Sequence, residues 1–423
     1  MTNNNINNVL LCSVIGTILE WYDFFLFGAL SSIMAEKFFA HNDIPPLISS
    51  FGVFAIGYLA RPFGSIFWGH IGDTIGRKKT LLYSIALMTA STISIGFLPS
   101  YETIGLYAPL LLIVLRIMQG FSVSGEHTGC LLMVGESIQN HKNDFYLSFC
   151  LSSIYIGILM ANLFSFSLAY FLGQQLFIDW GWRITFIIGA FLGIISYYLR
   201  RNTEETLSFK NIIKNNEHIK MPFLYLIRNN LVTVLLGAGV FQLAVSIPYV
   251  IFIFLPSYFK GNLSFFSNSI SLIMVSVLII IFGLISNDKT RKKILISSAV
   301  LVVAFSIPIL NRLQNARYLH LFISQIVFSI LCAAYVGAVG RYMINLFPIN
   351  VRYSGIAASL NLAAIFFGGG TPLILSILTH KTNNINYIGY FLVLSSIIAI
   401  FSLLLNVKNK YESNTRFAEY RAN

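Results

Sequence analysis

Two acidic side chains stand one helical turn apart in an apolar segment near the start of the chain. Glu20 and Asp23 are three residues apart, so on a helix they share one face. Ionisable groups at membrane depth are costly and usually mark a functional site. Burial and a neighbouring like charge favour the protonated carboxyl group, whereas a nearby cation favours the ionised one. The pair can therefore bind and release a proton, or it can orient the helix at the membrane interface.

Arg116 is the candidate cation for this pair. It lies in another apolar segment and can face Glu20 or Asp23 if the two helices are neighbours. Glu126 follows Arg116 by ten residues, which is about 15 Å along a helix. The two cannot pair on one continuous helix, so Glu126 needs another partner and is a candidate for a gate or for a purely structural contact.

Two further arginines in apolar segments are candidate anchors for a bound carboxylate, since guanidinium groups pair with carboxylates in a bidentate manner. These are Arg61 and Arg341. For Arg61, pairing with an internal acid is the alternative. A cationic ammonium group needs an aromatic face instead, and Trp21 and Tyr22 can supply one. With 37 Phe and 21 Tyr in the chain, however, most aromatic side chains will be core or lipid-facing.

A glycine-rich basic loop reads GHIGDTIGRKKTLL. Its glycines allow close helix packing and a sharp turn. Its one acid can accept hydrogen bonds from helix N-terminal amides or from a basic side chain, and its arginine can pair with a carboxylate across a helix interface. We predict that this loop acts as a latch on the cytoplasmic side; the candidate gate residues are Gly69, Gly72, Asp73, Gly76, Arg77, Lys78 and Glu126.

The composition restricts what can position these residues. Only 10% of the 423 residues are charged and 56% are hydrophobic, with a mean hydropathy of +0.74. This excludes a soluble enzyme, a disordered scaffold and a nucleic-acid reader. The net charge of +12 is better explained by basic loops on one side of a membrane. The chain has no HExxH, GxSxG or GxxxxGK[ST] motif, and we expect neither a metal nor a nucleotide.

Apolar runs of about 20 residues, the length that crosses a bilayer, occur twelve times. They predict an all-α integral membrane protein whose spans start near residues 9, 46, 80, 103, 145, 182, 231, 265, 294, 318, 355 and 387. One long polar interruption separates six spans from six. The predicted units are an N-terminal bundle (1–200), a cytoplasmic central loop (201–228), a C-terminal bundle (229–407) and a cytoplasmic tail (408–423).

The distribution of Lys and Arg predicts the orientation. With the N-terminus inside, 19 of the 28 fall in inside segments and six in outside segments. By the positive-inside rule, both termini and the central loop are cytoplasmic.

The halves also resemble each other. GHIGDTIGRKKTLL is matched by GLISNDKTRKKILI, in which Gly283, Arg291, Lys292 and Lys293 repeat the earlier glycine and basic residues 214 positions later. Two parallel six-helix halves with a site between them near the midplane form one transporter architecture. Asn287 stands where the first loop has Asp73, so we expect the second latch to be weaker.

Several motifs resemble the major facilitator superfamily and its metabolite:proton symporter branch. They are GTILEWYDFFLFG, ARPFGSIFWGHIGD, RIMQGFSVSGEHTG, DWGWRITF, LRRNTEETLSF and FPINVRYSG, which cover nearly the whole chain in the family's order. Bacterial proline/betaine, α-ketoglutarate, shikimate and citrate permeases share them. The resemblance implies a twelve-helix fold, alternating access, and proton coupling through Glu20, Asp23 and Arg116. The departures are Ser124, the altered second loop and Arg341.

The resemblance implies a symporter for a small carboxylate-bearing solute, and we expect a proline- or glycine-betaine-like osmolyte. The alternatives are an α-ketoglutarate or other dicarboxylate:proton symporter, and a receptor-like protein of the same fold that has lost transport. We expect a monomer in the bacterial inner membrane that is driven by the proton gradient without a cofactor. Arg61, Arg341, Trp21 and Tyr22 are the candidate substrate contacts.

Overall fold

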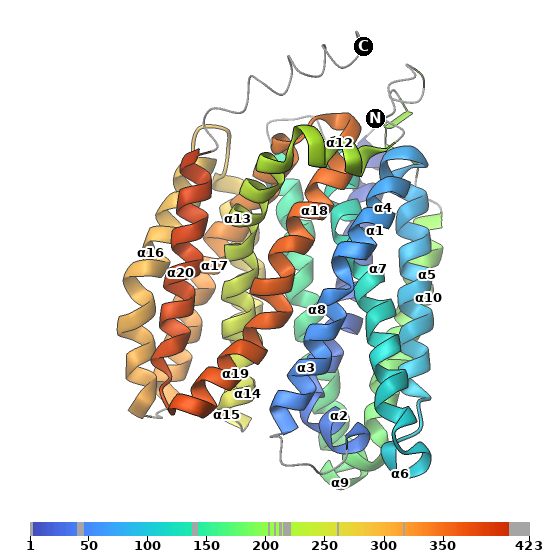
Figure 1. Ribbon diagram of the computed structural model, residues 1–423, viewed down its shortest axis with the longest axis vertical. Coiled ribbons are helices and arrows are strands. Elements are labelled where there is room, and N and C mark those ends of the chain that lie inside the picture. Colours follow the sequence, from blue (N-terminus) through green and yellow to red (C-terminus); the bar gives the residue numbers. More distant parts are fainter. Residues whose placement is uncertain are drawn as a thin grey trace.

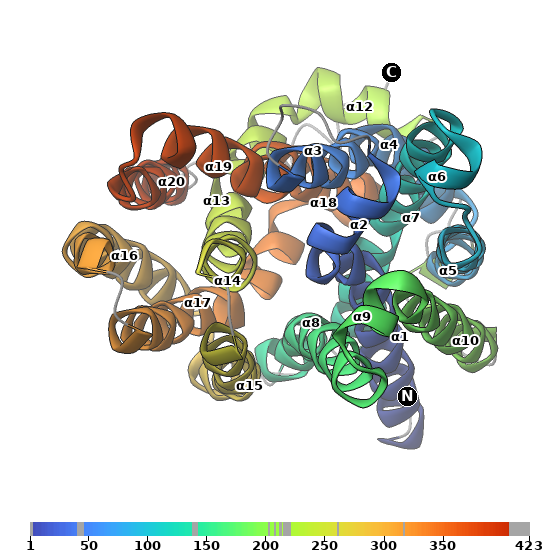
Figure 2. The same ribbon diagram turned by 90° about the horizontal axis from the view of Figure 1, so that it is seen from below.

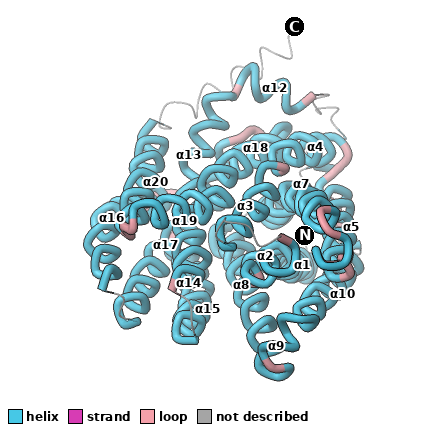
Figure 3. Tube along the Cα trace, turned by 60° about the horizontal axis from the view of Figure 1, so that its bottom comes forward, coloured by secondary structure: helices cyan, strands magenta, loops and turns pink. Residues whose placement is uncertain are grey.

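The structure is a computed structural model. It describes residues 3–39, 46–137, 143–201, 204–206, 209–210, 214, 221–259, 262–315 and 318–405, and within these ranges the regular structure is helical, with no strand (Figure 3). Ten helical segments there have the length and hydropathy to cross a membrane. The segments predicted as the second and third spans are helical as well, which brings the predicted spans found as helices to twelve. The predicted fold class is confirmed.

The first six spans include short helices at the ends of the bundle. Their bounds are α1 Asn3–Ala29, α2 Ser31–Phe38, α3 Pro46–Leu59, α4 Arg61–Thr74, α5 Arg77–Gly96, α6 Tyr101–Ile104, α7 Tyr107–Ser137, α8 Asn143–Leu172, α9 Gln174–Leu176, η1 Phe177–Gly181 and α10 Trp182–Arg201.

The second set of spans follows α12 (Pro222–Asn229). Their bounds are α13 Leu231–Pro248, η2 Tyr249–Phe254, α14 Leu255–Tyr258, α15 Asn262–Ile285, α16 Arg291–Asn311, η3 Arg312–Asn315, α17 Tyr318–Leu346, η4 Ile349–Val351, α18 Arg352–Ala364, η5 Ile365–Gly369, α19 Gly370–Thr382 and α20 Asn386–Leu405.

The helices form two groups that meet along a central seam (Figures 1 and 2). In the first group α1 packs against α7, α8 and α10, and α5 packs against α7 and α10. In the second, α16 packs against α17 and α20, and α13 packs against α18 and α20. Across the seam, α8 packs against α15 and α4 packs against α18. The domain limits at residues 200, 228 and 407 stay predictions.

The start of α1, the end of α20 and α12 lie at one end of the bundle, at the top of Figure 1. We call this the inner end, after the predicted orientation, and the opposite end the outer end. The repeated loops both lie between consecutive spans, and the helix after each begins at the matching arginine: α5 at Arg77 and α16 at Arg291. The helix starts therefore follow the internal repeat.

Three spans depart from a continuous α-helix beside the seam. The second span is interrupted at Ala60, and α4 restarts at Arg61 with a proline in its first turn. The seventh span has Pro248 at the end of α13, followed by the π-helical η2, and the eleventh contains the π-helical η5. A proline ring removes a backbone donor, and π-turns often occur at functional sites.

Candidate functional site

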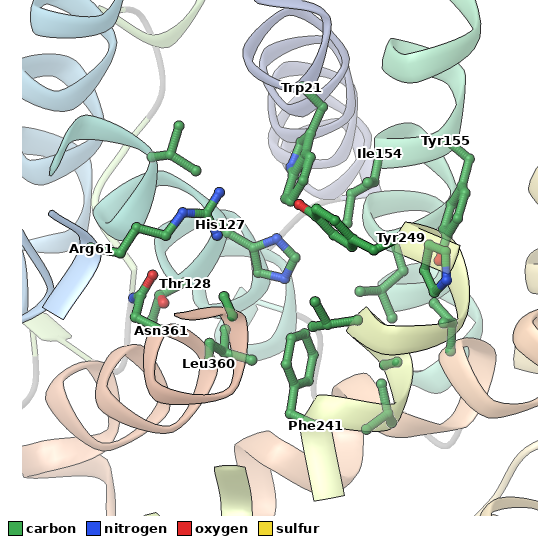
Figure 4. Close-up of a pocket in the computed structure, with 18 of the residues that line it drawn as sticks. Trp21, Arg61, His127, Thr128, Ile154, Tyr155, Phe241, Tyr249, Leu360 and Asn361 are labelled. Atoms are coloured by element: carbon green, nitrogen blue, oxygen red, sulfur yellow. The ribbon is translucent and has the colours of Figure 1, made fainter. Parts of the chain in front are cut away.

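A cavity lies between the two groups of helices, near the middle of the spans. Its walls come from α1, α4, α7 and α8 on one side and from α13, η2, α17 and α18 on the other (Figure 4). Most of the lining is aliphatic or aromatic, with a few polar groups, which is typical of a small-molecule site. The polar lining residues are Arg61, Ser124, His127, Thr128, Tyr155, Tyr249 and Asn361.

Arg61 is the cation of this cavity. The break at Ala60 places it in the first turn of α4, in the middle of the span, and its side chain extends toward the cavity (Figure 4). Its guanidinium carbon is 4.0 Å from the centre of the Tyr58 ring and 4.7 Å from that of Phe24. Its Nε and Nη2 atoms are buried and have no hydrogen-bond partner in the described structure. Arg61 is thus held by aromatic faces and keeps donors free for an anion.

His127 lies beside Arg61, on the same side of the cavity (Figure 4). Its imidazole is packed edge-on between Trp21 and Phe241, at ring-centre distances of 5.7 and 5.9 Å. The Nε2 atom of His127 and the hydroxyl oxygen of Thr128 are buried without a hydrogen-bond partner in the described ranges. The cavity therefore offers a bound molecule two further polar groups besides the Arg61 guanidinium.

Glu20 is buried on α1, with 3% of its surface exposed, and neither carboxylate oxygen has a hydrogen-bond partner in the described structure. The cations whose charge reaches it are Arg200 and Arg61. A buried carboxylate without a hydrogen bond is costly when ionised, and taking up a proton would remove that cost at Glu20.

Asp23 lies in a different environment from Glu20. Its Oδ2 accepts a 3.3 Å hydrogen bond from the Thr92 hydroxyl on α5, and its Oδ1 lies so close to Gly189 on α10 that a Cβ there would overlap it. The two acids share α1, as predicted, but Asp23 points toward α5 and α10.

Arg116 is fully buried and makes no direct ion pair with Glu20 or Asp23 in the described structure. Its guanidinium lies over Phe27 and Phe24, at 4.4 and 4.9 Å from the ring centres. The Nη1 atom of Arg116 donates a hydrogen bond to the side-chain oxygen of Gln119 at 2.7 Å. Gln119 in turn donates to Thr92 at 2.9 Å. Arg116 is therefore linked to Asp23 through two polar side chains.

Glu126 finds the separate partner that the helix spacing required. It forms a buried ion pair with Arg200 from the end of α10, and its Oε2 accepts a 2.9 Å hydrogen bond from Ser84. The Arg200 guanidinium lies against Gly16 of α1, where a Cβ would overlap it. Arg200 lies at the junction with the predicted central loop, but its side chain turns back among α1, α7 and α10.

Asp73 joins the two groups of helices at the inner end. Its carboxylate accepts hydrogen bonds from the backbone N–H groups of Tyr353 and Ser354, at 3.3 and 2.9 Å, and from the Ser354 hydroxyl at 2.7 Å. These amides belong to the first turn of α18, where N–H groups have no partner within the helix. Arg77 pairs with Asp73 at 3.4 Å. Both kinds of contact considered for this acid are therefore present.

The glycines make this crossing possible. A Cβ on Gly72 would overlap the Tyr353 ring, and one on Gly69 would press on Ser354. Gly76 has φ of +131°, a conformation that side-chain-bearing residues rarely adopt.

Arg77 extends the contact to α7 and to the second group. It pairs with Glu136 at 3.6 Å and donates to the Ile349 carbonyl oxygen at 3.4 Å. Arg352 of α18 pairs with the same Glu136 oxygen at 3.6 Å. Four charged groups thus close the inner end around the seam.

The segment after α10 also reaches this cluster. Glu205 accepts a 3.1 Å hydrogen bond from the backbone N–H of Lys78, in the first turn of α5. The Thr206 hydroxyl donates to Glu136 at 3.1 Å, and the Phe209 ring centre is 4.8 Å from the Arg77 guanidinium. Glu205, which belongs to the motif LRRNTEETLSF, thus contacts the start of α5.

The second repeated loop makes its own contact between the groups. Arg291 forms a bidentate pair with Asp144 of α8, at 2.9 and 2.6 Å, and Ser286 donates to the same carboxylate. Asn287 accepts hydrogen bonds from the N–H groups of Lys289 and Thr290 within its own loop. In the first loop Asp73 supplies the carboxylate that pairs with the arginine. In the second loop, where Asn287 takes its place, Asp144 of α8 supplies that carboxylate. Whether this latch is weaker stays a prediction.

Two predicted substrate contacts lie away from the cavity. The Tyr22 hydroxyl donates to the Thr185 carbonyl oxygen at 2.9 Å, toward α10. Arg341 lies near the inner end of α17, where it donates to the Gly135 carbonyl oxygen at 3.4 Å. Trp21 and Arg61 line the cavity, so the structure brings together two of the four.

A family model described as Major Facilitator Superfamily matches residues 13–311. The chain belongs to the major facilitator superfamily. It is 28% identical to the glycine betaine/proline/ectoine/pipecolic acid transporter OusA of Dickeya dadantii, over 97% of this chain and 84% of that protein. It is 30% identical to the metabolite transport protein YhjE of Escherichia coli (97% and 96%) and 32% identical to a citrate-proton symporter of Klebsiella pneumoniae (92% and 88%).

Solved structures of the superfamily share the fold. The proton:xylose symporter XylE bound to a bromo-deoxyglucose aligns with a TM-score of 0.78 at 16% identity, over 97% of both chains. The inward-open XylE of E. coli gives a TM-score of 0.68, over 95% of this chain and 96% of that one. The recognised family and its multi-pass membrane architecture are confirmed.

Sequence reasoning missed His127, Arg200, Asp144 and Glu136. His127 had a usable signal, because it stands next to Glu126 in the motif RIMQGFSVSGEHTG. Asp144 and Glu136 flank the loop after α7, and only packing between segments distant in sequence gives them partners.

Proposed function

We propose that this protein is a proton-coupled symporter that carries a small solute with one carboxylate, of the proline or betaine kind, by alternating access. The single observation behind this is Arg61: a buried cation on the wall of the central cavity, with two hydrogen-bonding nitrogens that no described protein group uses. A solute carboxylate would satisfy both the charge and the donors.

The cationic end of a zwitterion would meet aromatic side chains. Trp21, Phe25, Phe241 and Tyr249 line the cavity around Arg61 and His127. Aromatic faces attract cationic ammonium groups, which suits a betaine or proline nitrogen. Because Arg341 lies outside the cavity, a second arginine for a dicarboxylate is lacking in the described lining.

Glu20 would couple the solute to the proton. Its carboxylate and the solute's carboxylate would compete for the charge of Arg61, so a proton on Glu20 restores the balance when the solute binds. Coupling requires that the two ligands change the same free energy, and a shared guanidinium provides this. Asp23 and Arg116, linked through Gln119 and Thr92, form a second proton-exchanging unit.

Alternating access would use the inner-end contacts as its gate. Asp73 with the first turn of α18, and Asp144 with Arg291, hold the two groups together at the inner end. Opening that end requires both contacts to break. A monomer in the bacterial inner membrane, with cytoplasmic termini and no cofactor, fits this proposal.

A dicarboxylate or other organic-acid symporter is the second candidate. A relative at 32% identity is named a citrate-proton symporter, and His127 beside Arg61 could bind a second carboxylate when protonated. A receptor-like protein without transport would be the third.

Uptake into vesicles with an imposed pH step tests the proposal. We expect accumulation of labelled proline or betaine that stops with an uncoupler, and competition by unlabelled betaine or proline rather than 2-oxoglutarate. Competition by 2-oxoglutarate alone would favour the organic-acid candidate. Accumulation that follows sodium would overturn proton coupling, and binding without uptake would favour the receptor.

A further inference from the structure

His127 has no role in the coupling scheme above, yet it is the most central polar group of the cavity. Its ring points into the space between the two groups of helices, and the Arg61 guanidinium points toward it (Figure 4). Arg61 and His127 come from the neighbouring helices α4 and α7, which pack against each other.

The packing of His127 fixes the ring without using its polar atoms. Trp21 and Phe241 hold it edge-on from opposite groups of helices, at 5.7 and 5.9 Å between ring centres. Buried polar atoms in proteins nearly always have a hydrogen-bond partner. The Nε2 of His127, the hydroxyl of Thr128 and the indole nitrogen of Trp21 all line this cavity and have none in the described structure.

A neutral imidazole offers one donor and one acceptor nitrogen, whereas Arg61 offers donors only. The carboxylate of a solute can use the donors of Arg61, but the acceptor of His127 needs an N–H or O–H group. A quaternary ammonium has neither, so its methyl groups would leave the imidazole unpaired. Sites built to form a hydrogen bond reject analogues that lack it, because their buried polar groups then lose a partner.

We propose that His127 is the specificity-determining residue of the cavity and selects carboxylate solutes that carry an N–H or O–H donor next to the carboxylate. This inference rests on the proposed function and narrows its substrate class. It favours secondary amines and hydroxy acids over fully methylated betaines. Arg61 binds the carboxylate, and His127 accepts the hydrogen bond.

Two matched solute pairs test the selection. N-Methylproline and N,N-dimethylproline differ in one N–H, and malate and succinate differ in one hydroxyl group. Uptake of each is measured in vesicles that contain the full-length protein, with and without a pH step. For the parent protein we expect the donor-bearing member of the transported pair to be preferred by about tenfold or more in kcat/KM.

Substitutions at His127 separate recognition from folding. H127Q keeps a hydrogen-bond acceptor and should retain most of the preference, whereas H127F should reduce it to about twofold or less. H380F makes the same chemical change at an exposed histidine at the end of α19 and should leave the preference unchanged. If H127F does not fold, H127Q is compared with H127N instead. Because the Asn side chain is shorter, H127N should retain less of the preference for donor-bearing solutes than H127Q.

The outcomes distinguish this inference from the function on which it rests. Uptake driven by the pH step with no preference in either pair, or a preference that H127F retains, overturns the role of His127 and leaves symport intact. A reversed preference for the methylated solute does the same. No uptake of any of the four solutes, nor of proline or betaine in the same vesicles, overturns both.

Discussion

Arg116 and Asp23 are joined by three consecutive hydrogen bonds that pass through Gln119 and Thr92. The distances are 2.7 Å from Arg116 to Gln119, 2.9 Å from Gln119 to Thr92, and 3.3 Å from Thr92 to Asp23. The path runs from α7 through α5 to α1 and is buried throughout. A change of protonation at Asp23 would therefore be felt at Arg116 through an ordered set of dipoles.

The hydroxyl group of Thr92 is the central link of this path. T92V keeps the shape of the side chain and removes both hydrogen bonds, which leaves buried groups on Asp23 and Gln119 unpaired. We expect a loss of about 1–3 kcal/mol in the free energy of unfolding, together with weaker gradient-driven accumulation. Thermal unfolding in detergent and vesicle uptake measure the two effects.

T89V is the matched control, one turn away on the same helix. Its hydroxyl donates to the Ile85 carbonyl oxygen of its own helix, so removing it breaks no link between helices. Equal effects of T92V and T89V on accumulation would show that the path to Arg116 has no role.

Loss of both charges on α1 should uncouple transport. An E20Q, D23N double variant should lose accumulation driven by a pH step but still exchange solute across the membrane, because Arg61 keeps its donors. Since the two acids have different surroundings, we expect E20Q alone to affect coupling to the solute more strongly. Counterflow and pH-driven uptake in the same vesicles separate the two activities; parental accumulation by the double variant would remove both acids from the mechanism.

The latch at Asp73 should govern the speed of transport rather than solute affinity. The D73N variant replaces one carboxylate oxygen with an NH2 group, which is a donor and cannot accept hydrogen bonds from the N–H groups of α18. It should weaken the contact between the two groups of helices at the inner end by about 1–3 kcal/mol. We expect a lower uptake velocity with solute binding retained. E102Q, which neutralises an exposed acid of α6, is the control. Unchanged velocity in a well-expressed D73N protein would contradict this role.

The pair of Asp144 and Arg291 should matter as much as Asp73. Removing one partner of a buried ion pair costs about 3–5 kcal/mol when the remaining charge is uncompensated. Arg291 keeps a 2.9 Å pair with Asp288, so we expect the loss of the Asp144 carboxylate to cost less than that. D144N should therefore lower both thermal stability and uptake velocity. The exchange D144R, R291D should recover part of each, and a D144N protein as stable and fast as the parent would show that the second latch is dispensable.

The two arginines predicted as anchors can be separated directly. R61Q should lower solute affinity by tenfold or more, on the order of 1.4 kcal/mol, because the cavity loses its guanidinium. R61K should recover only part, since a lysine lacks the bidentate fork. R341Q should have a small effect on affinity, because Arg341 lies outside the cavity. Solute binding to purified protein measures all three, and the reverse order would move the anchor to Arg341.

The sequence by itself determined the fold class and the position of several contacts at the inner end. Long apolar runs must become helices in a bilayer, because backbone groups find no other partners there. The repeat offset of 214 residues located the start of α16 from that of α5. Asp73 is the one acid in a glycine-rich loop. The type of its partners could be predicted, since helix N-termini and arginines both attract a carboxylate.

Only the tertiary structure decided which polar groups meet. Glu20 and Asp23 share a helix, yet neighbouring helices give one the charge of Arg200 and Arg61 and the other the hydroxyl of Thr92. Arg200 reads as a loop charge until α1 and α7 pack around it, and Asp144 reaches Arg291 only because its end of α8 lies across the seam from the start of α16. Periodicity identifies the face of one helix, whereas contacts between helices distant in sequence depend on how both groups pack, which no local pattern encodes.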